Sequence, residues 1–364
     1  MARTSADSES GSSTLTVTRR CSDRFLRGLE QASRVTFVSH VHADPDSLGS
    51  MLGLAHLVEC CLGTPTRLTR DGPICRAENR AMVEVLNLEL VPVEHLEWDD
   101  NEVVVMVDSQ PNTGRHNFNG GIPLYAVIDH HDTPGDVDGI PFVDVRRKLG
   151  ATCSLVTRYL MEQDVPVPKR VATALFYGIE TELSGYPREA APLDDSALHV
   201  LFPLTDKDAL SRIRNARLPE SYYECILQGL QSSFIYDRLM LCWIDEMDSA
   251  EHAAEVCDFM MRLEQVDWVV VGGVYQDQLI LSVRTVRPHG RAGEMLRQVV
   301  GRLGKAGGHN RRAGGSVPLP STSPSAVEEL QSELRRRFLR ALRIDEDTRG
   351  RRLMPLRAML QNLQ

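Results

Sequence analysis

The sequence predicts a two-domain α/β protein, with a parallel β-sheet in the N-terminal domain and a smaller α/β domain after it. The chain has 364 residues, which exceeds one typical domain. Its first half alternates short runs of apolar, β-branched residues with helical patterns, which is typical of a parallel sheet covered on both faces. After a stretch of helices, a second alternation of strands and helices begins near Tyr236.

The N-terminal pattern predicts three buried strands, at 35–38, 103–107 and 124–128. Helices are expected at 21–31, 47–61, 77–86, 151–163 and 168–179. Each of the three strands ends directly in polar residues. Because open α/β sheets bind ligands at the carboxyl ends of their strands, these polar residues are the first candidates for a functional site.

Composition shifts divide the chain into five expected regions. They are a disordered arm at 1–12, a first α/β domain at 13–190, a helical connector at 191–235, a second α/β domain at 236–345 and a basic tail at 346–364. Connector helices are expected at 194–202, 207–215 and 219–233. Second-domain strands are expected at 239–244, 268–275, 278–285 and 316–319, and helices at 250–263, 292–303 and 326–343. The segment 304–315 is glycine-rich, and a flexible basic loop is the alternative to a functional interpretation of it.

The charge balance restricts the class of partner. Lys and Arg number 41 against 50 Asp and Glu, which gives a formal net charge of −9. An acidic chain is a poor match for broad binding along a nucleic-acid backbone, whereas a small phosphorylated substrate remains compatible because a bound metal can reverse the local charge. The eight cysteines form no C-x-x-C pair, and neither a secretory signal nor a membrane-spanning run is visible. We therefore expect a soluble, cytoplasmic protein with no membrane partner.

Three potential metal ligands fall within seven residues in the segment SHVHADPDSLGS. They are His40, Asp44 and Asp46, and Pro45 stiffens the turn between the two carboxylates. An aspartate before a helix is commonly only an N-cap, and that interpretation suffices for Asp46 alone. It does not explain the whole triplet, since capping requires one acid and no histidine.

Further candidate ligands follow the next two predicted strands. Asp108 ends the run VVVMVD, where a lone aspartate is more often a turn residue. Asp129, His130 and His131 follow the strand at 124–128 directly, although loops commonly carry polar residues without function. Glu182 follows the predicted helix at 173–179, and for a single glutamate a solvated charge is the ordinary interpretation.

Together these carboxylates and imidazoles indicate a site for two divalent cations. Mixed oxygen and nitrogen ligands favour Mn²⁺, with Mg²⁺, Co²⁺ or Fe²⁺ possible, and the absence of thiolates disfavours structural zinc. Two cations about 3.5–4 Å apart are the usual clamp for a phosphoryl substrate, with a bridging hydroxide as the nucleophile.

The ordered motifs HVHADPDSLGS, VDSQ, VIDHH and GGHNRRAGG resemble the signature of the DHH-family phosphoesterases that carry a DHH-associated C-terminal domain. The resemblance covers about residues 20–320. It implies an active site in the cleft between the two domains. Members include oligoribonucleases that also dephosphorylate 3′-phosphoadenosine 5′-phosphate, cyclic-dinucleotide phosphodiesterases, single-strand exonucleases and, more distantly, manganese pyrophosphatases.

The resemblance assigns roles to individual residues. His40 and Asp44 would hold one cation and Asp46 and His130 the other, with Asp108 between them. His131 would face the substrate phosphate, and Asp129 would support the two histidines. The last expected ligand is an Asp, where this sequence has Glu182, one methylene longer. In the second domain, the substrate-binding residues would be Arg284, Gly307, Gly308 and His309.

The predicted function is hydrolysis of small nucleotide phosphoesters, such as short oligoribonucleotides or nucleoside bisphosphates, with Mn²⁺ and possibly as a homodimer. The small size follows from the missing long basic groove. Two alternatives remain: a nucleotide-binding regulatory module with weakened catalysis, motivated by Glu182, and a soluble cyclic-dinucleotide phosphodiesterase.

Overall fold

The computed structural model describes residues 20–354 except 119–121, 133, 184–189 and 309. The described residues fall into two compact units. Unit 1 lies within Met1–Pro73 and Leu86–Leu210, and unit 2 lies within Ile74–Val85 and Ser211–Gln364. The expected arm at 1–12 and the end of the expected basic tail lie outside the described residues.

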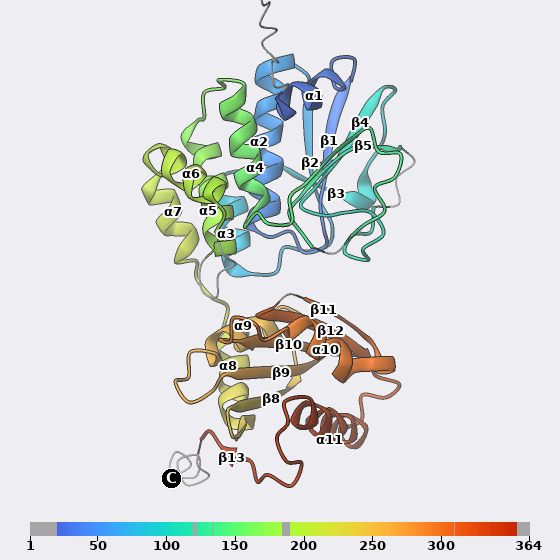
Figure 1. Ribbon diagram of the computed structural model, residues 1–364, viewed down its shortest axis with the longest axis vertical. Coiled ribbons are helices and arrows are strands. Elements are labelled where there is room, and N and C mark those ends of the chain that lie inside the picture. Colours follow the sequence, from blue (N-terminus) through green and yellow to red (C-terminus); the bar gives the residue numbers. More distant parts are fainter. Residues whose placement is uncertain (1–19, 119–121, 133, 184–189, 309, 355–364) are drawn as a thin grey trace, which may run out of the picture. The chain divides into compact units, whose positions relative to one another are not determined.

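The centre of unit 1 is a six-stranded β-sheet in which all neighbouring strands are parallel (Figure 1). The strand order is β3-β2-β1-β4-β5-β6. The strands are β1 (Arg34–Val38), β2 (Thr66–Arg70), β3 (Leu90–Pro92), β4 (Glu102–Val107), β5 (Leu124–Asp129) and β6 (Phe142–Val145). The pattern predicted β1, β4 and β5, which are almost entirely buried. It missed β2, β3 and β6, because they are short and only partly buried.

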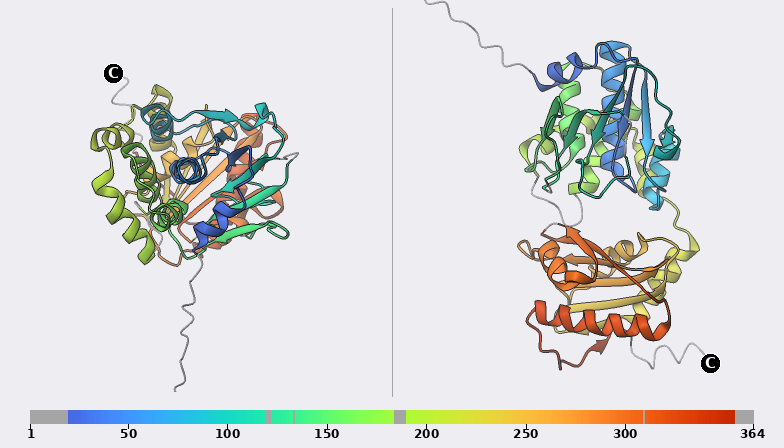
Figure 2. Two further views of the ribbon diagram at one scale, coloured as in Figure 1. Left: turned by 90° about the horizontal axis from the view of Figure 1, so that it is seen from above. Right: turned by 90° about the vertical axis from the view of Figure 1, so that its right-hand side faces the viewer.

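Helices cover one face of this sheet. They are α1 (Cys21–Arg27), α2 (Pro45–Leu62), α4 (Thr152–Glu162), α5 (Lys169–Leu183) and α6 (Pro192–Leu201), followed by the 3₁₀ turn η2 (Phe202–Leu204). Helix α2 contacts β1, β2 and β4 and packs against both α4 and α5 (Figures 1 and 2). Gly49 of α2 and Gly178 of α5 allow this close packing, since a Cβ atom at either would lie within 3 Å of the neighbouring helix.

Loop segments cover the other face of the sheet, where the sequence suggested helices. Val104 and Met106 of β4 and Val127 of β5 form a small core there with Phe118. The partly buried side chains packed against it come mostly from loops and from the 3₁₀ turn η1 (Val93–His95). They include Val93, Trp98, Ile122, Val137 and Ile140. The expectation of a sheet covered on both faces is met, but by loops on this side.

Unit 2 is built on a mixed seven-stranded sheet of order β11-β12-β10-β9-β8-β7-β13. Its strands are β7 (Phe234–Tyr236), β8 (Leu239–Glu246), β9 (Trp268–Tyr275), β10 (Gln278–Thr285), β11 (Lys305–Gly308), β12 (Arg312–Pro318) and β13 (Arg351–Arg352). Only β8 and β9 pair in parallel; every other pairing in this sheet is antiparallel. The strand expected at 316–319 begins earlier, at Arg312, and it pairs with Lys305–Gly308, because small residues in both strands let the backbones approach closely.

The helices of unit 2 are α3 (Ala77–Val85), α8 (Glu220–Ser232), α9 (His252–Met260), α10 (Ala292–Val300) and α11 (Pro324–Ala341), with the 3₁₀ turn η3 (Gly301–Leu303); α7 (Lys207–Arg214) spans the border between the units. Apolar residues of α10 and α11, such as Leu296 and Phe338, pack on β9 and β10 in one continuous core. Before α3, Arg76 forms an ion pair with Glu251, its Nε atom lying 3.0 Å from the carboxylate. This ion pair ties the segment CRAENR to the rest of unit 2.

Two further expectations concern cysteines and membranes. All eight cysteines are free thiols, and four of them are fully buried: Cys153, Cys225, Cys242 and Cys257. Within the described residues, no helix combines the length and the apolar character needed to cross a bilayer. A cytoplasmic location stays a prediction.

Candidate metal centre

The three predicted strand-end clusters meet at one edge of the unit 1 sheet. Strand β4 lies between β1 and β5 in the sheet, and all three run in the same direction. Their carboxyl ends therefore lie side by side, and the residues that follow them converge. They bring together His40, Asp108 and His130, whose side chains are almost completely buried.

The loop after β1 places His40 and Asp44 next to each other. The Nδ1 atom of His40 lies 2.8 Å from the carbonyl oxygen of Val41, so this nitrogen carries the proton when the ring is neutral. The other nitrogen, Nε2, lies 3.5 Å from Asp44 Oδ2. Asp44 caps helix α2, because its Oδ1 atom accepts a hydrogen bond of 2.9 Å from the Ser47 amide. One carboxylate oxygen thus orders the helix while the other faces the histidine.

Asp46 lies in the first turn of α2 and does not cap its own helix. Its two carboxylate oxygens accept hydrogen bonds of 2.7 Å from the amides of Thr152 and Cys153, at the start of α4. The positive end of the α4 dipole stabilises a negative charge there. Burial and the nearby carboxylates, first that of Asp108, raise the pKa of Asp46 well above its usual range. The Oδ2 atom of Asp46 also lies 3.6 Å from His130 Nε2.

Asp108 is the residue common to both sides of the cluster. Its Oδ2 atom lies 3.4 Å from His40 Nε2, and its Oδ1 atom lies 3.4 Å from His130 Nε2. The Thr152 hydroxyl donates a hydrogen bond of 2.8 Å to Oδ1 and holds the carboxylate in place. Asp108 adopts a left-handed backbone conformation, with φ of 56°, which is uncommon outside glycine and is often found at functional sites. Its two oxygens therefore face two different ligand sets.

The segment Asp129–His131 is ordered by a second group of hydrogen bonds. Asp129 Oδ1 lies 2.7 Å from His131 Nδ1, and the Gln110 amide donates a hydrogen bond of 2.6 Å to Asp129 Oδ2. Burial opposes the charge of Asp129, but its hydrogen bond with His131 holds the pKa of this carboxyl well below its usual range. His130 Nδ1 lies 3.2 Å from the carbonyl oxygen of Leu149, which leaves Nε2 directed at Asp46 and Asp108.

Glu182 lies in the last turn of α5, which continues past the expected end at 179 and reaches Leu183. Its negative charge contributes to the raised pKa of Asp46, so the two carboxylates are close enough to repel each other. The approach depends on Gly178: a Cβ atom there would lie 2.8 Å from the carbonyl oxygen of Pro45 and 3.1 Å from the Cα atom of Asp46. The longer side chain at position 182 therefore reaches toward the Asp46 side of the cluster.

The cluster fits divalent cations on the evidence of its own atoms. Two sets each bring one ligand atom per residue to within 4.8 Å of one another: His40, Asp44 and Asp108, and Asp108, His130 and His131. Among the described residues, His40 Nε2 and Asp108 Oδ2 are buried with no hydrogen-bond partner. Burial lowers the pKa of His40, but Asp44 and Asp108 more than offset this and raise it to about 10. A cation between these atoms would satisfy both and replace the proton.

The residues expected to bind substrate in unit 2 lie on β10 and β11. Arg284 is buried and pairs with Asp258, with Nε 2.5 Å from Oδ1 and Nη2 3.4 Å from Oδ2. Its Nη1 atom donates to the Ser282 hydroxyl at 3.0 Å. Gly307 and Gly308 end β11, and His309 lies outside the described residues. Substrate binding by these residues, and a site in a cleft between domains, stay predictions.

Sequence reasoning assigned no role to two residues that organise the cluster. Gln110, within the VDSQ motif, links Asp129 to the loop at Gly135, whose amide donates 2.9 Å to Gln110 Oε1. Thr152 contacts Asp46 through its amide and Asp108 through its hydroxyl. Gln110 could have been found by its place directly after the motif aspartate. Thr152 could not, since it is 44 residues from Asp108 and belongs to no motif.

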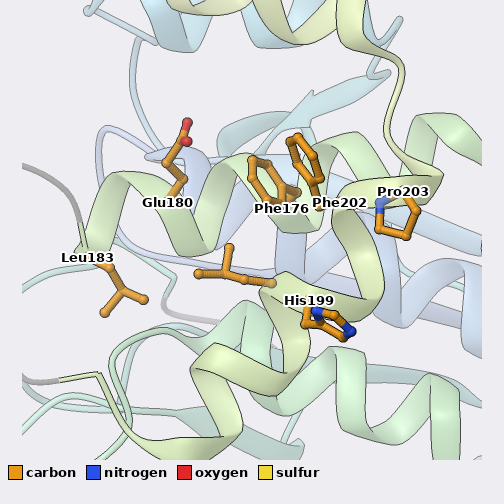
Figure 3. A pocket seen from close by; sticks show the side chains of 7 residues that line it. Phe176, Glu180, Leu183, His199, Phe202 and Pro203 are labelled. Carbon is orange, nitrogen blue, oxygen red and sulfur yellow. The ribbon is translucent and has the colours of Figure 1, made fainter.

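A separate hollow in unit 1 has different chemistry. It has a volume of about 700 Å³ and lies between α5, α6 and η2 (Figure 3). Its lining is mainly apolar, with the rings of Phe176 and Phe202 5.5 Å apart. Among its lining residues, Glu180 and His199 are the only ones with an ionisable side chain. The carboxylate and imidazole ligands gather at the strand ends instead, and the site is assigned there.

The carboxyl edge of this parallel sheet gathers buried aspartates and histidines around Asp108, an arrangement typical of metal-dependent hydrolases. Residues 34–179 match the DHH family, N-terminal domain. This stretch therefore carries a DHH-family N-terminal domain, as the motifs within it indicated.

Comparison with individual proteins supports the fold over most of the chain. An uncharacterised protein of Methanocaldococcus jannaschii is 27% identical over 335 residues, which cover 90% of this chain and 68% of that protein. A probable manganese-dependent inorganic pyrophosphatase of Streptococcus agalactiae serotype Ia is 25% identical over 151 residues, which cover 40% of this chain and 47% of that protein. The crystal structure of an exopolyphosphatase-related protein from Bacteroides fragilis superposes with a TM-score of 0.71 at 17% identity, covering 88% of this chain and 97% of that one.

Proposed function

We propose that this protein is a manganese-dependent phosphoesterase that hydrolyses small nucleotide phosphoesters, such as short oligoribonucleotides or nucleoside bisphosphates. Two cations would be held by His40, Asp44 and Asp108 on one side and by Asp46, Asp108 and His130 on the other, with Glu182 beside Asp46. When bound, such cations supply the positive charge that polarises a phosphoryl group and activates water.

The observation that carries the proposal is the position of Asp108. Its two carboxylate oxygens face His40 and His130 separately, at 3.4 Å each. A single structural ion would need only one of these sets, whereas paired cations require a carboxylate shared between them. Manganese is supported by the mixed oxygen and nitrogen ligands and by the similarity to the Streptococcus agalactiae protein, a probable manganese-dependent pyrophosphatase.

The protein's own groups would position the substrate and handle protons. His131 is held by Asp129 at Nδ1, which keeps the proton on that nitrogen and directs Nε2 away from the carboxylate. Its side chain is less buried than that of His130, so it is available to a phosphate oxygen or a leaving group. Gln110 fixes the other oxygen of Asp129 and so the orientation of the pair.

Inorganic pyrophosphate is a second candidate substrate, favoured by the alignment with the Streptococcus agalactiae protein. That alignment covers only 40% of this chain and 47% of that protein, so it leaves most of this chain without a counterpart in the pyrophosphatase. The glycine-rich hairpin of unit 2 allows close backbone approach to a ligand, which suits a nucleotide.

The test is a digestion panel in which products are resolved. Dinucleotides of RNA, 3′-phosphoadenosine 5′-phosphate, cyclic dinucleotides and pyrophosphate are each incubated with purified protein and Mn²⁺, and with EDTA as the control. Turnover of a linear dinucleotide or of the bisphosphate, abolished by EDTA, is the expected result. Preference for pyrophosphate would replace the nucleotide assignment. Binding of Mn²⁺ and nucleotide with turnover appearing only in Glu182→Asp would instead identify a regulatory binding module.

A further inference from the structure

The loop after β4 presents an arginine, Arg115, at a fixed place beside the metal cluster. The carbonyl oxygen of Arg115 accepts a hydrogen bond of 2.7 Å from the amide of Val41, the residue next to His40. Two residues on, Asn117 donates to both carboxylate oxygens of Asp71, from its amide at 2.5 Å and from Nδ2 at 2.9 Å. The backbone that carries Arg115 is therefore held at Arg115 itself and two residues after it.

Phe118, three residues after Arg115, anchors the same loop. It is buried against the sheet, and its ring packs edge-on at 5.9 Å from Trp98. A loop tied by hydrogen bonds at Arg115 and Asn117 and by apolar packing at Phe118 does not depend on ligand binding for its position. A side chain on such a loop is preorganised, which lowers the entropy cost of binding.

The guanidinium group of Arg115 has no counter-ion of its own. It is half-buried, and within the part of the chain that the structure describes it makes no hydrogen bond and no ion pair. Half-buried arginines normally pair with carboxylates, because the planar donor fork matches two acceptor oxygens. An unpaired one beside a ligand cluster therefore points to an anionic ligand.

The charge of Arg115 acts on the cluster itself. Burial has the largest effect on both neighbouring groups, lowering the pKa of His40 and raising that of Asp44. The positive charge of Arg115 lowers the pKa of each of them. The guanidinium group is thus close enough to interact with this side of the cluster, yet it is not hydrogen-bonded to either residue.

We propose that Arg115 is a substrate-binding residue that holds the phosphate group undergoing cleavage, beside the set formed by His40, Asp44 and Asp108. The inference rests on the proposed function and narrows it to a substrate whose reacting group carries at least one anionic oxygen. Two divalent cations would carry four positive charges against five carboxylates of the cluster and its surroundings: Asp44, Asp46, Asp108, Asp129 and Glu182. That sum is one negative charge, which repels an anion, and the guanidinium group of Arg115 offsets it at the place where the phosphate would bind.

The experiment compares the full-length wild type with Arg115→Met, Arg115→Lys and a matched control, Arg27→Met. Arg27 is an exposed arginine of α1 that precedes the sheet. Binding of inorganic phosphate to the Mn²⁺-loaded protein is measured by calorimetry, and Mn²⁺ affinity is measured separately. KM and kcat are measured on whichever substrate of the digestion panel is turned over.

Arg115→Met is expected to weaken phosphate binding at least tenfold and to lower kcat/KM about a hundredfold, with partial recovery in Arg115→Lys and no change in Arg27→Met. Mn²⁺ affinity should stay equal or rise slightly, since a positive charge is removed. Unchanged phosphate binding with altered Mn²⁺ affinity would mean that Arg115 only balances the carboxylates, and the inference would be rejected. If phosphate binding depends on Arg115 but the wild type turns over no substrate of the panel, the proposed function alone would be rejected. No phosphate binding in the Mn²⁺-loaded wild type would reject both.

Discussion

The Nε2 atom of His40 lies 3.4 Å from the Oδ2 atom of Asp108, and across the described chain neither atom has a hydrogen-bond partner. Buried polar atoms are rarely left in this state, because each costs about 1–3 kcal/mol. Both belong to residues that sequence motifs had marked as cation ligands. The pair is therefore the most direct sign that this edge of the sheet is built for a metal.

Asp108→Ala should lower turnover by at least about a thousandfold, because it removes the carboxylate shared by both ligand sets. It should also lower Mn²⁺ binding from two equivalents to one or none, measured by calorimetry or electron paramagnetic resonance. The fold should be kept, as judged by circular dichroism. Asp138→Ala, an exposed acid beyond the DHH motif, is the control. Substantial activity left in Asp108→Ala would disprove the bridging role.

Thr152→Val should weaken Mn²⁺ binding by about 10–100-fold, because its hydroxyl orients Asp108 through a hydrogen bond of 2.8 Å. Thr157→Val is the matched control on the same helix. The Thr157 hydroxyl donates to the backbone carbonyl of Cys153 and contacts no ligand. Equal Mn²⁺ affinities in the two variants would show that the Thr152 bond does not orient the ligand.

Glu182→Gln should reduce the affinity for the Mn²⁺ ion on the Asp46 side of the cluster, since it removes a negative charge that acts on Asp46. The same change should lower the pKa of Asp46 in the metal-free protein. Glu182→Asp is expected to keep Mn²⁺ binding, because the carboxylate remains at the end of α5. The measurement is a Mn²⁺ titration of each variant; identical curves for wild type and Glu182→Gln would place Glu182 outside the metal site.

Mn²⁺ binding should become tighter as pH rises toward about 10. Below that value the metal-free protein keeps a proton on His40, whose raised pKa reflects Asp44 and Asp108 acting against burial. A cation must displace this proton, so affinity should grow by up to about tenfold per pH unit and binding should release about one proton from this residue. Calorimetry in buffers of different ionisation enthalpy counts released protons. Mn²⁺ binding to His40→Asn should release about one proton fewer than Mn²⁺ binding to the wild type. An equal number of released protons would contradict the assignment of this proton to His40.

Glu255→Gln should stabilise the protein at pH 8 by about 2–3 kcal/mol and have little effect at pH 4. Burial raises the pKa of Glu255 to about 7, with Arg76 opposing the shift. The folded protein therefore keeps a proton that the unfolded chain loses near pH 4.5, and stability falls as pH rises from about 4.5 to 7. Urea unfolding at both pH values measures the effect, with the exposed Glu264→Gln as control. A loss of stability in Glu255→Gln at pH 8 would show that its interaction with Arg76 outweighs burial.

Much of the site could be predicted from the chain alone, for a physical reason that applies to particular residues. Asp108 and Asp129 end or follow strands in which almost every residue is apolar, and such strands are typical of the centre of a parallel sheet. Parallel strands bring their carboxyl ends to one edge, so ligands that follow different strands were expected to meet. The outer strands β2, β3 and β6 were missed because half-buried strands carry no such run.

The sequence by itself determined which residues would gather, because strand direction and the order of polar residues are local properties of the chain. Only the tertiary structure decided how they are held. Asp46 is bound by the amides of α4, and Asp108 by Thr152, through contacts that span 44 residues or more. The same applies to Arg115, which has no motif and is placed by a backbone bond to Val41. Orientation of a ligand depends on distant backbone and hydroxyl groups, which no local pattern encodes.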